Sequence, residues 1–410
     1  MKKHTWTPHK MLLGLCVAWL GVALIVMSIT RDHWYHTVTS DVLLTGIVVE
    51  EVDARGVRQT VRIRSDAFPR RVQVTMTGTP RVREGDMVEI GCELTNVEDV
   101  SWKQFRYDRY LMKENVSVLC DSWRSPHVLG RARGVRVWLS DLRLAIEKNL
   151  TRYLHEPHAS LLTGILYGSV SMLPDGWRDA FRRSGMSHIV AVSGYNVMLV
   201  ASAAMRVLTY WFLKRQYAYV VVMICVAVFA ALAGGGAAVV RAAIMGGLVL
   251  SAQQIGRPSS SLMLLLLAAT GMTIARPRIL LDDAGFHLSF AAAAGLMWLS
   301  PQLSAHLPFL PTVIRKTAAD SLSAIAATAP ILLWQFHQWS SAALIANILI
   351  VPLIPLAMVL GVVAILGSWV AAVMHADIAG FVMTFPSYIV LDLILSLVQL
   401  FASLPFFDWT

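Results

Sequence analysis

The stretch "GMSHIVAVSGYNV", residues 185–197, places side chains capable of chemistry inside an otherwise apolar segment. Its polar members include His188, Ser193 and Asn196. Polar groups at membrane depth are costly unless they meet a partner or a water-filled space. Two kinds of chemistry are compatible with this pattern: nucleophilic catalysis by the serine, or the lining of a hydrated path.

Catalysis by Ser193 is the weaker alternative. The tetrapeptide "AVSG" at 191–194 resembles the G-x-S-G of rhomboid-type intramembrane serine proteases, with Ala191 replacing the first glycine. A serine nucleophile needs a base within hydrogen-bond reach. His188 is a poor local base, because five helical residues place it about 140° around the axis from Ser193. His287 in "GFHLSF" is the better candidate base. We predict no catalytic residue and keep an intramembrane serine hydrolase as an alternative.

A hydrated path is the preferred interpretation. Arg241 lies in "GGGAAVVRAAIMGGLVL", and an arginine in an apolar span usually faces the bundle interior or water. Snorkelling of its side chain to the membrane interface stays open. The predicted lining of the path is His188, Ser193, Asn196, Arg241, His287 and Ser289.

The sequence gives no sign of metal or nucleotide chemistry. Its histidines lack the close pairing of a zinc or di-metal motif. A G-x-x-x-x-G-K-[ST] phosphate loop is absent from the sequence. We therefore predict no cofactor and no metal, and any driving force must come from another protein.

Composition indicates which elements position these residues. Of 410 residues, 56% are hydrophobic and 15% charged, whereas soluble domains have about one-quarter charged residues. Apolar runs long enough to span a membrane recur from residue 11 onward, which predicts a polytopic α-helical membrane protein with about eight to ten transmembrane helices. The last candidate spans are 342–360 and 361–401, the latter expected to be two helices. Residues 1–40 are expected to hold an uncleaved transmembrane helix with its N-terminus in the cytoplasm.

Residues 41–121 have a different pattern. Short alternating runs such as "VRQTVRIRS" predict about five strands and a small extracellular β-barrel, OB-like in fold. Basic and aromatic residues there are candidates for guiding a single-stranded nucleic acid, with a solvated strand face and core aromatics as the alternative. These candidates are Arg58, Arg62, Arg64, Arg70, Tyr107 and Tyr110. Cys92 and Cys120 both fall in this domain and are a candidate disulfide, with two free thiols equally open.

The segment 131–155 has helical periodicity, with apolar residues such as Val135, Trp138 and Leu142 at spacings of three and four among many arginines. This pattern is typical of an amphipathic helix on a membrane surface. An ordinary helix packed against the barrel is the alternative. Residues 160–410 then form the polytopic transmembrane domain.

Taken together, several motifs resemble the ComEC family, the inner-membrane channel that brings single-stranded DNA into the cytoplasm during natural transformation. Besides residues 185–197, which match the family's A-[IV]-S-G-L-H segment, the matching stretches run in family order. They are "KQFRYDRYLMKENVSVLC" (103–120), "LLTGILYGSVSMLPDGWRDAFRRSG" (161–185), "VVRAAIMGGLVLSAQQIGRP" (239–258), "DDAGFHLSFAAAAGL" (282–296) and "APILLWQFHQWSSAALIANILIVPLIPLAMVLG" (329–361). Tyr195 and Asn196 replace the family's usual Leu-His, so proton transfer at the second position is in doubt, because an amide does not titrate.

The resemblance implies uptake of single-stranded DNA through the bacterial cytoplasmic membrane, with the β-barrel outside. The expected partners are single-stranded DNA, the lipid bilayer, a separate nuclease and a cytoplasmic DNA-translocating ATPase. A separate nuclease is expected because the H-x-H-x-D-H run of the metallo-β-lactamase-type domain carried by many members is not found. The alternative is a transporter or membrane scaffold of the same fold that does not move DNA.

Overall fold

The protein divides into two compact units, residues 30–146 and residues 1–29 with 147–410. The computed structural model describes residues 8–29, 42–55, 58–77, 81–97, 111, 114–122, 124–168, 173–190, 194–211, 213–234, 237–255, 260–275, 277–336, 340 and 342–404. The two units are treated in turn.

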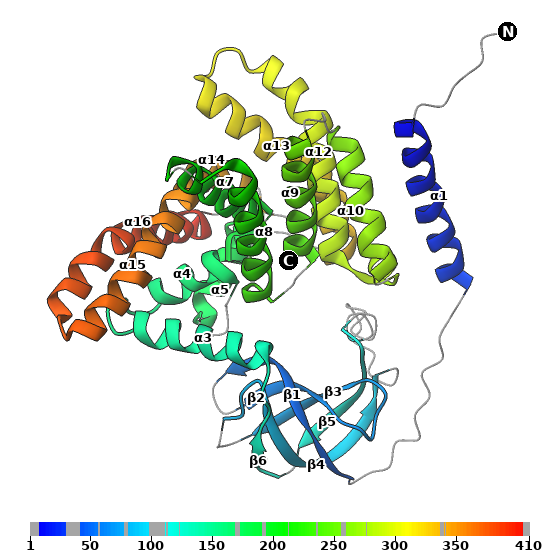
Figure 1. The fold of residues 1–410 in the computed structure, drawn as a ribbon, viewed down its shortest axis with the longest axis vertical. Helices are drawn as coiled ribbons and strands as arrows, with labels where there is room; N and C mark the ends of the chain where they lie inside the picture. Colours follow the sequence, from blue (N-terminus) through cyan, green and yellow to red (C-terminus); the bar gives the residue numbers. More distant parts are fainter. Residues whose placement is uncertain are drawn as a thin grey trace. The chain divides into compact units, whose positions relative to one another are not determined.

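The first unit is built around a β-barrel (Figure 1). Its strands are β1 (Val42–Arg55), β2 (Arg58–Arg64), β3 (Arg71–Thr77), β4 (Asp86–Asn96), β5 (Val116–Ser122) and β6 (His127–Arg131). They are hydrogen-bonded in the order β1-β2-β3-β5-β4-β6, and a further pairing of β1 with β4 closes the first five into a barrel. The β3–β5 pairing is parallel and the others are antiparallel. The predicted five strands thus form the barrel, and β6 extends the sheet beyond the predicted boundary at residue 121.

Strand β1 pairs with two neighbouring strands, β4 and β2, along different parts of its length. Its first half pairs with β4 up to Ile47, and the part from Ile47 onward pairs with β2. Register shifts after Val48 and Glu51 bend the strand in this second part. A Cβ on Gly46 would lie 2.6 Å from the carbonyl oxygen of Arg64, so glycine permits the close approach at which β1 changes partner.

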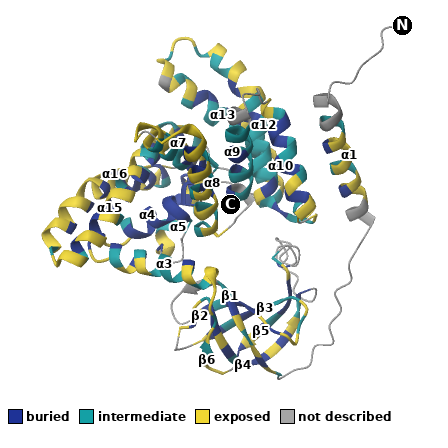
Figure 2. Ribbon diagram, viewed as in Figure 1, coloured by how far each residue is buried: buried dark blue, intermediate teal, exposed yellow. Residues whose placement is uncertain are grey.

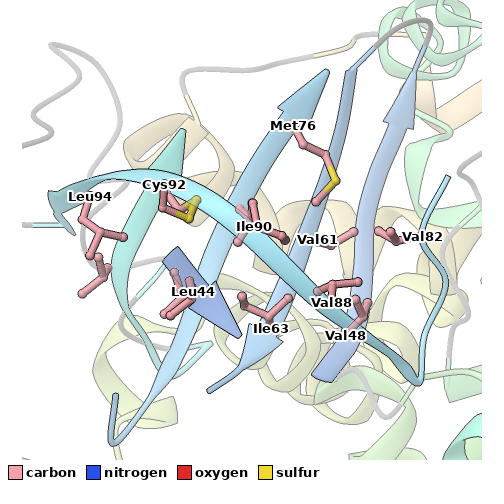
Figure 3. Close-up of a cluster of buried hydrophobic side chains, with 14 residues drawn as sticks. Leu44, Val48, Val61, Ile63, Met76, Val82, Val88, Ile90, Cys92 and Leu94 are labelled. Carbon is pink, nitrogen blue, oxygen red and sulfur yellow. A yellow bond between two sulfur atoms is a disulfide. The ribbon is translucent and has the colours of Figure 1, made fainter. Parts of the chain in front are cut away.

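The barrel interior is filled by alternate residues of the strands (Figure 3). On β2, Val61 and Ile63 are fully buried and pack with Leu44 and Ile90. Cys92 on β4 and Cys120 on β5 belong to the same buried cluster, and the structure joins them in a disulfide.

Helix α3 (Val135–Leu150) follows the barrel. A Cβ on Gly85, whose φ is +92°, would lie 2.5 Å from Val137 Cγ2, so the turn before β4 packs tightly on the helix. Leu139 is buried, whereas Val135 and Trp138 are 75% and 61% exposed. The helix therefore combines a packed face with exposed apolar side chains. Its placement on a membrane surface stays a prediction.

The second unit is helical. Its helices are α1 (Pro8–Ile29), α4 (His158–Tyr167), α5 (Asp175–Arg183), α6 (Ser187–Val190), α7 (Gly194–Tyr210), α8 (Arg215–Leu232), α9 (Ala237–Ile255), α10 (Ser261–Ala275), α11 (Ile279–Asp282), α12 (Ala284–His306), α13 (Thr312–Phe336), α14 (Ala343–Ile350), η2 (Val351–Leu353), α15 (Ile354–Met374) and α16 (Asp377–Ser403). Helices α12 and α13 pack on each other, as do α15 and α16 and, at the start of the bundle, α7, α8 and α9.

Four helical segments in the described part of the chain are long and apolar enough to cross a membrane. They are Arg215–Leu232, Ile314–Phe336, Ala343–Met374 and Asp377–Ser403. Four shorter apolar helices accompany them, Leu13–Ile25, Asn196–Tyr210, Val239–Ser251 and Ser261–Ala275. Exposed residues cover much of α15 and α16 (Figure 2), and many of them are large and apolar, which suits contact with lipid. The figure of eight to ten spans stays a prediction.

The predicted boundary between spans at residues 360 and 361 is wrong. Helix α15 runs without a break to Met374, and the chain turns at His375, which adopts a left-handed conformation with φ of +52°. The two prolines of "ILIVPLIPLAM" mark the short 3₁₀ segment η2 and the start of α15, where proline is tolerated.

Candidate functional site

Asn196 lies in the first turn of α7 and is buried. Its Nδ2 donates a hydrogen bond of 2.9 Å to the carbonyl oxygen of Ile165. Ile165 belongs to the last turn of α4, where carbonyls lack partners within the helix. The amide therefore ties the start of α7 to the end of α4. This bond accounts for a polar side chain at position 196.

Arg241 lies in the second turn of α9, where α7 and α12 also approach. Its Cζ is 5.5 Å from the centroid of the Phe290 ring on α12, a cation–π distance. A Cβ on Gly194 would lie 3.1 Å from Arg241 Nη2 and 3.2 Å from the Cβ of Ala242. Glycine at position 194 therefore leaves room for the guanidinium beside the first turn of α7.

The charge of Arg241 is not matched by a described acid. Its Nη1 is buried and has no hydrogen-bond partner among the described residues. A buried donor without an acceptor costs about 1–3 kcal/mol, and more when the group is charged. The ring of Phe290 offsets part of this cost for the guanidinium as a whole. The junction of α7, α9 and α12 is therefore a place where an anion or another acceptor would be stabilised.

The remaining predicted path residues have separate surroundings. On α12, the ring Nε2 of His287 is 2.8 Å from the carbonyl oxygen of Leu280, and Ser289 is half-buried next to Phe290 in sequence. His188 is exposed on α6, and Ser193 lies outside the described residues. The structure thus brings Arg241 together with the first turn of α7 and with α12, whereas the ring of His287 contacts Leu280.

Two cavities in the described part of the chain lie elsewhere. One is an apolar depression on α15, lined by Trp369, Val370, Val373 and Met374. The other is a small cavity beside α4. Neither is lined by a predicted path residue, so these cavities do not form a passage at the Arg241 junction.

In the barrel, the prediction that Arg62 guides DNA is corrected by its surroundings. Arg62 is 2% exposed, and its Nη1 is 2.9 Å from Glu50 Oε2 and 3.3 Å from Glu114 Oε2. Arg71 Nη1 is 3.4 Å from the same oxygen of Glu50. Burial lowers the pKa of the Arg71 guanidinium, and the nearby Glu50 partly offsets this effect. These charges hold the barrel together and are unavailable to a nucleic acid.

A signal for this pairing was present in the sequence. Glu50 and Arg62 are direct cross-strand partners in the hairpin formed by β1 and β2, and opposite charges often face each other in this way. Two register shifts in β1 obscure the pairing when residues are counted from the turn. Of the other DNA-guiding candidates, Arg58 and Arg64 are exposed on β2 and Arg70 is half-buried. Tyr107 and Tyr110 lie outside the described residues.

The helical unit combines four segments long and apolar enough to cross a membrane with an arginine whose Nη1 is buried at a helix junction. A family model described as Competence protein matches residues 165–410, which is more than half of the chain. The chain therefore belongs to the competence protein family. Comparisons with curated proteins and with solved structures each gave no match.

Proposed function

We propose that the helical unit conducts single-stranded DNA across the bacterial cytoplasmic membrane during DNA uptake. Membership of the competence family supports a role in DNA uptake. The observation that carries the finer proposal is the buried Nη1 of Arg241, which has no acceptor among the described residues at the junction of α7, α9 and α12.

A phosphodiester is the acceptor that such a guanidinium fits. Arginine binds phosphate oxygens through short charge-assisted hydrogen bonds. Phe290, which stacks on Phe286, faces the guanidinium with its ring and holds the charge at the junction. One fixed cation holds each passing phosphate weakly enough to release it, which conduction requires.

Passage of a strand requires the junction to open. A Cβ at position 194 would lie 3.1 Å from Arg241 Nη2, so the start of α7 covers the guanidinium and separation of α7 from α9 would expose it to the strand. Near Arg241 the helices meet through the small residues Gly194 and Ala242. Val197 of α7 and Val239 of α9 belong to one buried hydrophobic cluster, so opening of the junction also costs part of their packing. The conduit in this proposal is a transient opening between helices that are otherwise packed.

The barrel is proposed to gather the strand outside the membrane. Its strand order, with β3 parallel to β5 and β1 paired with β4, is typical of the OB-fold, which often binds oligonucleotides. The exposed Arg58 and Arg64 on β2 remain candidates for this contact. The energy source and the degradation of the second strand are assigned to partner proteins, a cytoplasmic DNA-translocating ATPase and a separate nuclease.

The proposal is tested by replacing Arg241 in a transformable host that depends on this protein. Arg241→Ala is expected to reduce entry of labelled DNA into the cytoplasm at an unchanged membrane level of the protein. Arg241→Lys should retain part of the uptake, because it keeps the charge but not the planar fork. Arg206→Ala, which removes an exposed arginine from α7, is the matched control and should leave uptake unchanged.

Two results would contradict the proposal. Normal uptake by Arg241→Ala would show that the guanidinium has no part in transport. Loss of the variant from the membrane would assign Arg241 a structural role instead. If deletion of the whole protein from its own host left DNA uptake unchanged there, the alternative of a transporter or scaffold that does not move DNA would be favoured.

A further inference from the structure

A small cavity lies between the end of α3 and the start of α4. Its lining residues are Glu147, Thr151, Glu156, Ala159, Ser160 and Thr163. The cavity measures about 10 Å³, room for a single water molecule or a small ion. Its lining contains two carboxylates and three hydroxyls, and no basic side chain.

The hydroxyl protons of both threonines are already used. Thr163 Oγ1 donates to the carbonyl oxygen of Ser160 at 3.2 Å, and Thr151 Oγ1 donates to that of Lys148 at 3.1 Å. A hydroxyl carries one proton and two lone pairs, so these oxygens retain only acceptor capacity. Most of the polar lining therefore consists of electron-pair donors.

Each of the two carboxylates accepts a hydrogen bond that fixes its position. The hydroxyl of Tyr167 donates to Glu147 Oε1 at 3.2 Å, and the backbone N–H of Ser160 donates to Glu156 Oε2 at 3.2 Å. Glu147 is buried and Glu156 is exposed, so one carboxylate lies deep in the cavity and the other at its mouth. The two acidic groups are thus fixed around a shared space.

Ser160 supplies an independent sign of a ligand. The residue is 2% exposed and lines the cavity, and its Oγ is buried without a hydrogen-bond partner among the described residues. Buried hydroxyls in folded proteins nearly always have a partner. An occupant of the cavity would give this oxygen one.

We propose that this cavity binds a hard divalent cation of the Ca²⁺ type. All available ligands are oxygens, which Ca²⁺ prefers and softer transition metals do not. Two carboxylates of like charge around one small space are balanced by a divalent cation and not by a water molecule. Mg²⁺ usually keeps several bound waters, for which this cavity is too small.

The proposed site differs from an acidic metal cluster. In the described part of the chain, no three His, Cys, Asp or Glu side chains gather as metal ligands. Here two carboxylates are completed by hydroxyl oxygens, a coordination that flexible Ca²⁺ geometry accommodates. The bound ion would join Glu147 and Thr151, at the end of α3, to Glu156, Ser160 and Thr163 at the start of α4. This role is independent of DNA transport.

The test uses the full-length protein in detergent after treatment with a chelator. Thermal unfolding is followed with CaCl₂, MgCl₂ or KCl at matched ionic strength, together with binding of ⁴⁵Ca²⁺. The expected result is saturable binding of Ca²⁺ with a rise in melting temperature that MgCl₂ and KCl do not reproduce. Glu147→Gln is expected to weaken Ca²⁺ binding by at least about tenfold. Glu93→Gln, an exposed carboxylate on β4, is the control and should bind Ca²⁺ normally.

Ser160→Ala gives a second test that does not depend on the folding of a glutamate variant. It should weaken Ca²⁺ binding, yet leave the chelator-treated protein as stable as the parent or more so, because an unpartnered buried hydroxyl is removed. Absence of saturable ⁴⁵Ca²⁺ binding would mean that the cavity holds water only and would overturn the proposal. An equal rise in melting temperature with KCl would mean that charge screening causes the stabilisation, and this result would also overturn the proposal.

Discussion

Replacing Arg62 by methionine tests whether the β-barrel depends on a buried charge. The guanidinium lies on β2 between two carboxylates, with Nη1 2.9 Å from Glu50 and 3.3 Å from Glu114. Methionine retains most of the apolar stem of arginine, so the change removes the charge and the hydrogen bonds while disturbing packing little. The two carboxylates are left next to each other.

The size of the effect follows from burial. Removing one partner of a buried ion pair costs about 3–5 kcal/mol, because the remaining charge is uncompensated. Here Glu50 is 45% exposed and Glu114 is 22% exposed, so water replaces part of the lost interaction. Glu50 also keeps Arg71 at 3.4 Å. We therefore expect a loss of about 2–3 kcal/mol in the free energy of opening of the barrel.

Hydrogen exchange of the full-length protein measures this quantity directly. Amides of β2 and β3 should exchange faster in Arg62→Met than in the parent protein, by the factor that corresponds to a loss of about 2–3 kcal/mol in opening free energy. Arg64→Met, an exposed arginine on the same strand, is the matched control and should change the opening free energy by less than about 0.5 kcal/mol. Equal exchange in the two variants would refute the assignment of Arg62 to the stability of the barrel.

Three further predictions concern stability. Cys92→Ser combined with Cys120→Ser should lower the opening free energy of the barrel by about 3–4 kcal/mol, the loop entropy expected for a sequence separation of 28. Unchanged hydrogen exchange of the amides in β4 and β5 would contradict this prediction. Asn196→Leu should lower the melting temperature of the helical unit, because the Ile165 carbonyl loses its donor at a cost of about 1–3 kcal/mol; an unchanged melting temperature would argue against this bond. Burial raises the pKa of Glu84 above its usual 4.5, although Arg143 and a hydrogen bond from Ser140 oppose this. The folded barrel therefore disfavours the ionised form of Glu84, which lowers its stability. This loss of stability is complete at a pH above the pKa of Glu84 in the folded barrel, and it disappears as the pH falls below the pKa of Glu84 in the unfolded chain. Glu84→Gln should remove this pH dependence, and a parallel pH profile of opening free energy in the two proteins would exclude the effect.

The sequence predicts the barrel well because its strands alternate. One face of β2 is buried as Val61 and Ile63, and this period of two is visible in the residues themselves. Strand β6 has no such signal, because its residues are largely exposed and it only extends the edge of β4. Strand β6 forms because its backbone pairs with β4, and this pairing is not visible in the sequence of residues 127–131.

The helical unit is harder to predict because its composition is uniformly apolar. The run from Ile354 to Met374 is continuous, and nothing in the sequence marks His375 as the residue at which the chain reverses. Arg241 is identified as unusual from its charge alone, but its neighbours Gly194 and Phe290 come from helices far away in the sequence. An aromatic residue in an apolar helix is indistinguishable from ordinary packing until the helices are placed.

The most direct test of a DNA path through the membrane unit is site-specific photocrosslinking during uptake. A photoreactive amino acid replaces Phe290, beside Arg241, and in a separate variant replaces Leu366, which is exposed on α15. The proposed path predicts covalent adducts between entering single-stranded DNA and position 290, with none at position 366. Continued uptake without an adduct at 290, or equal adducts at both positions, would contradict a path at the junction of α7, α9 and α12.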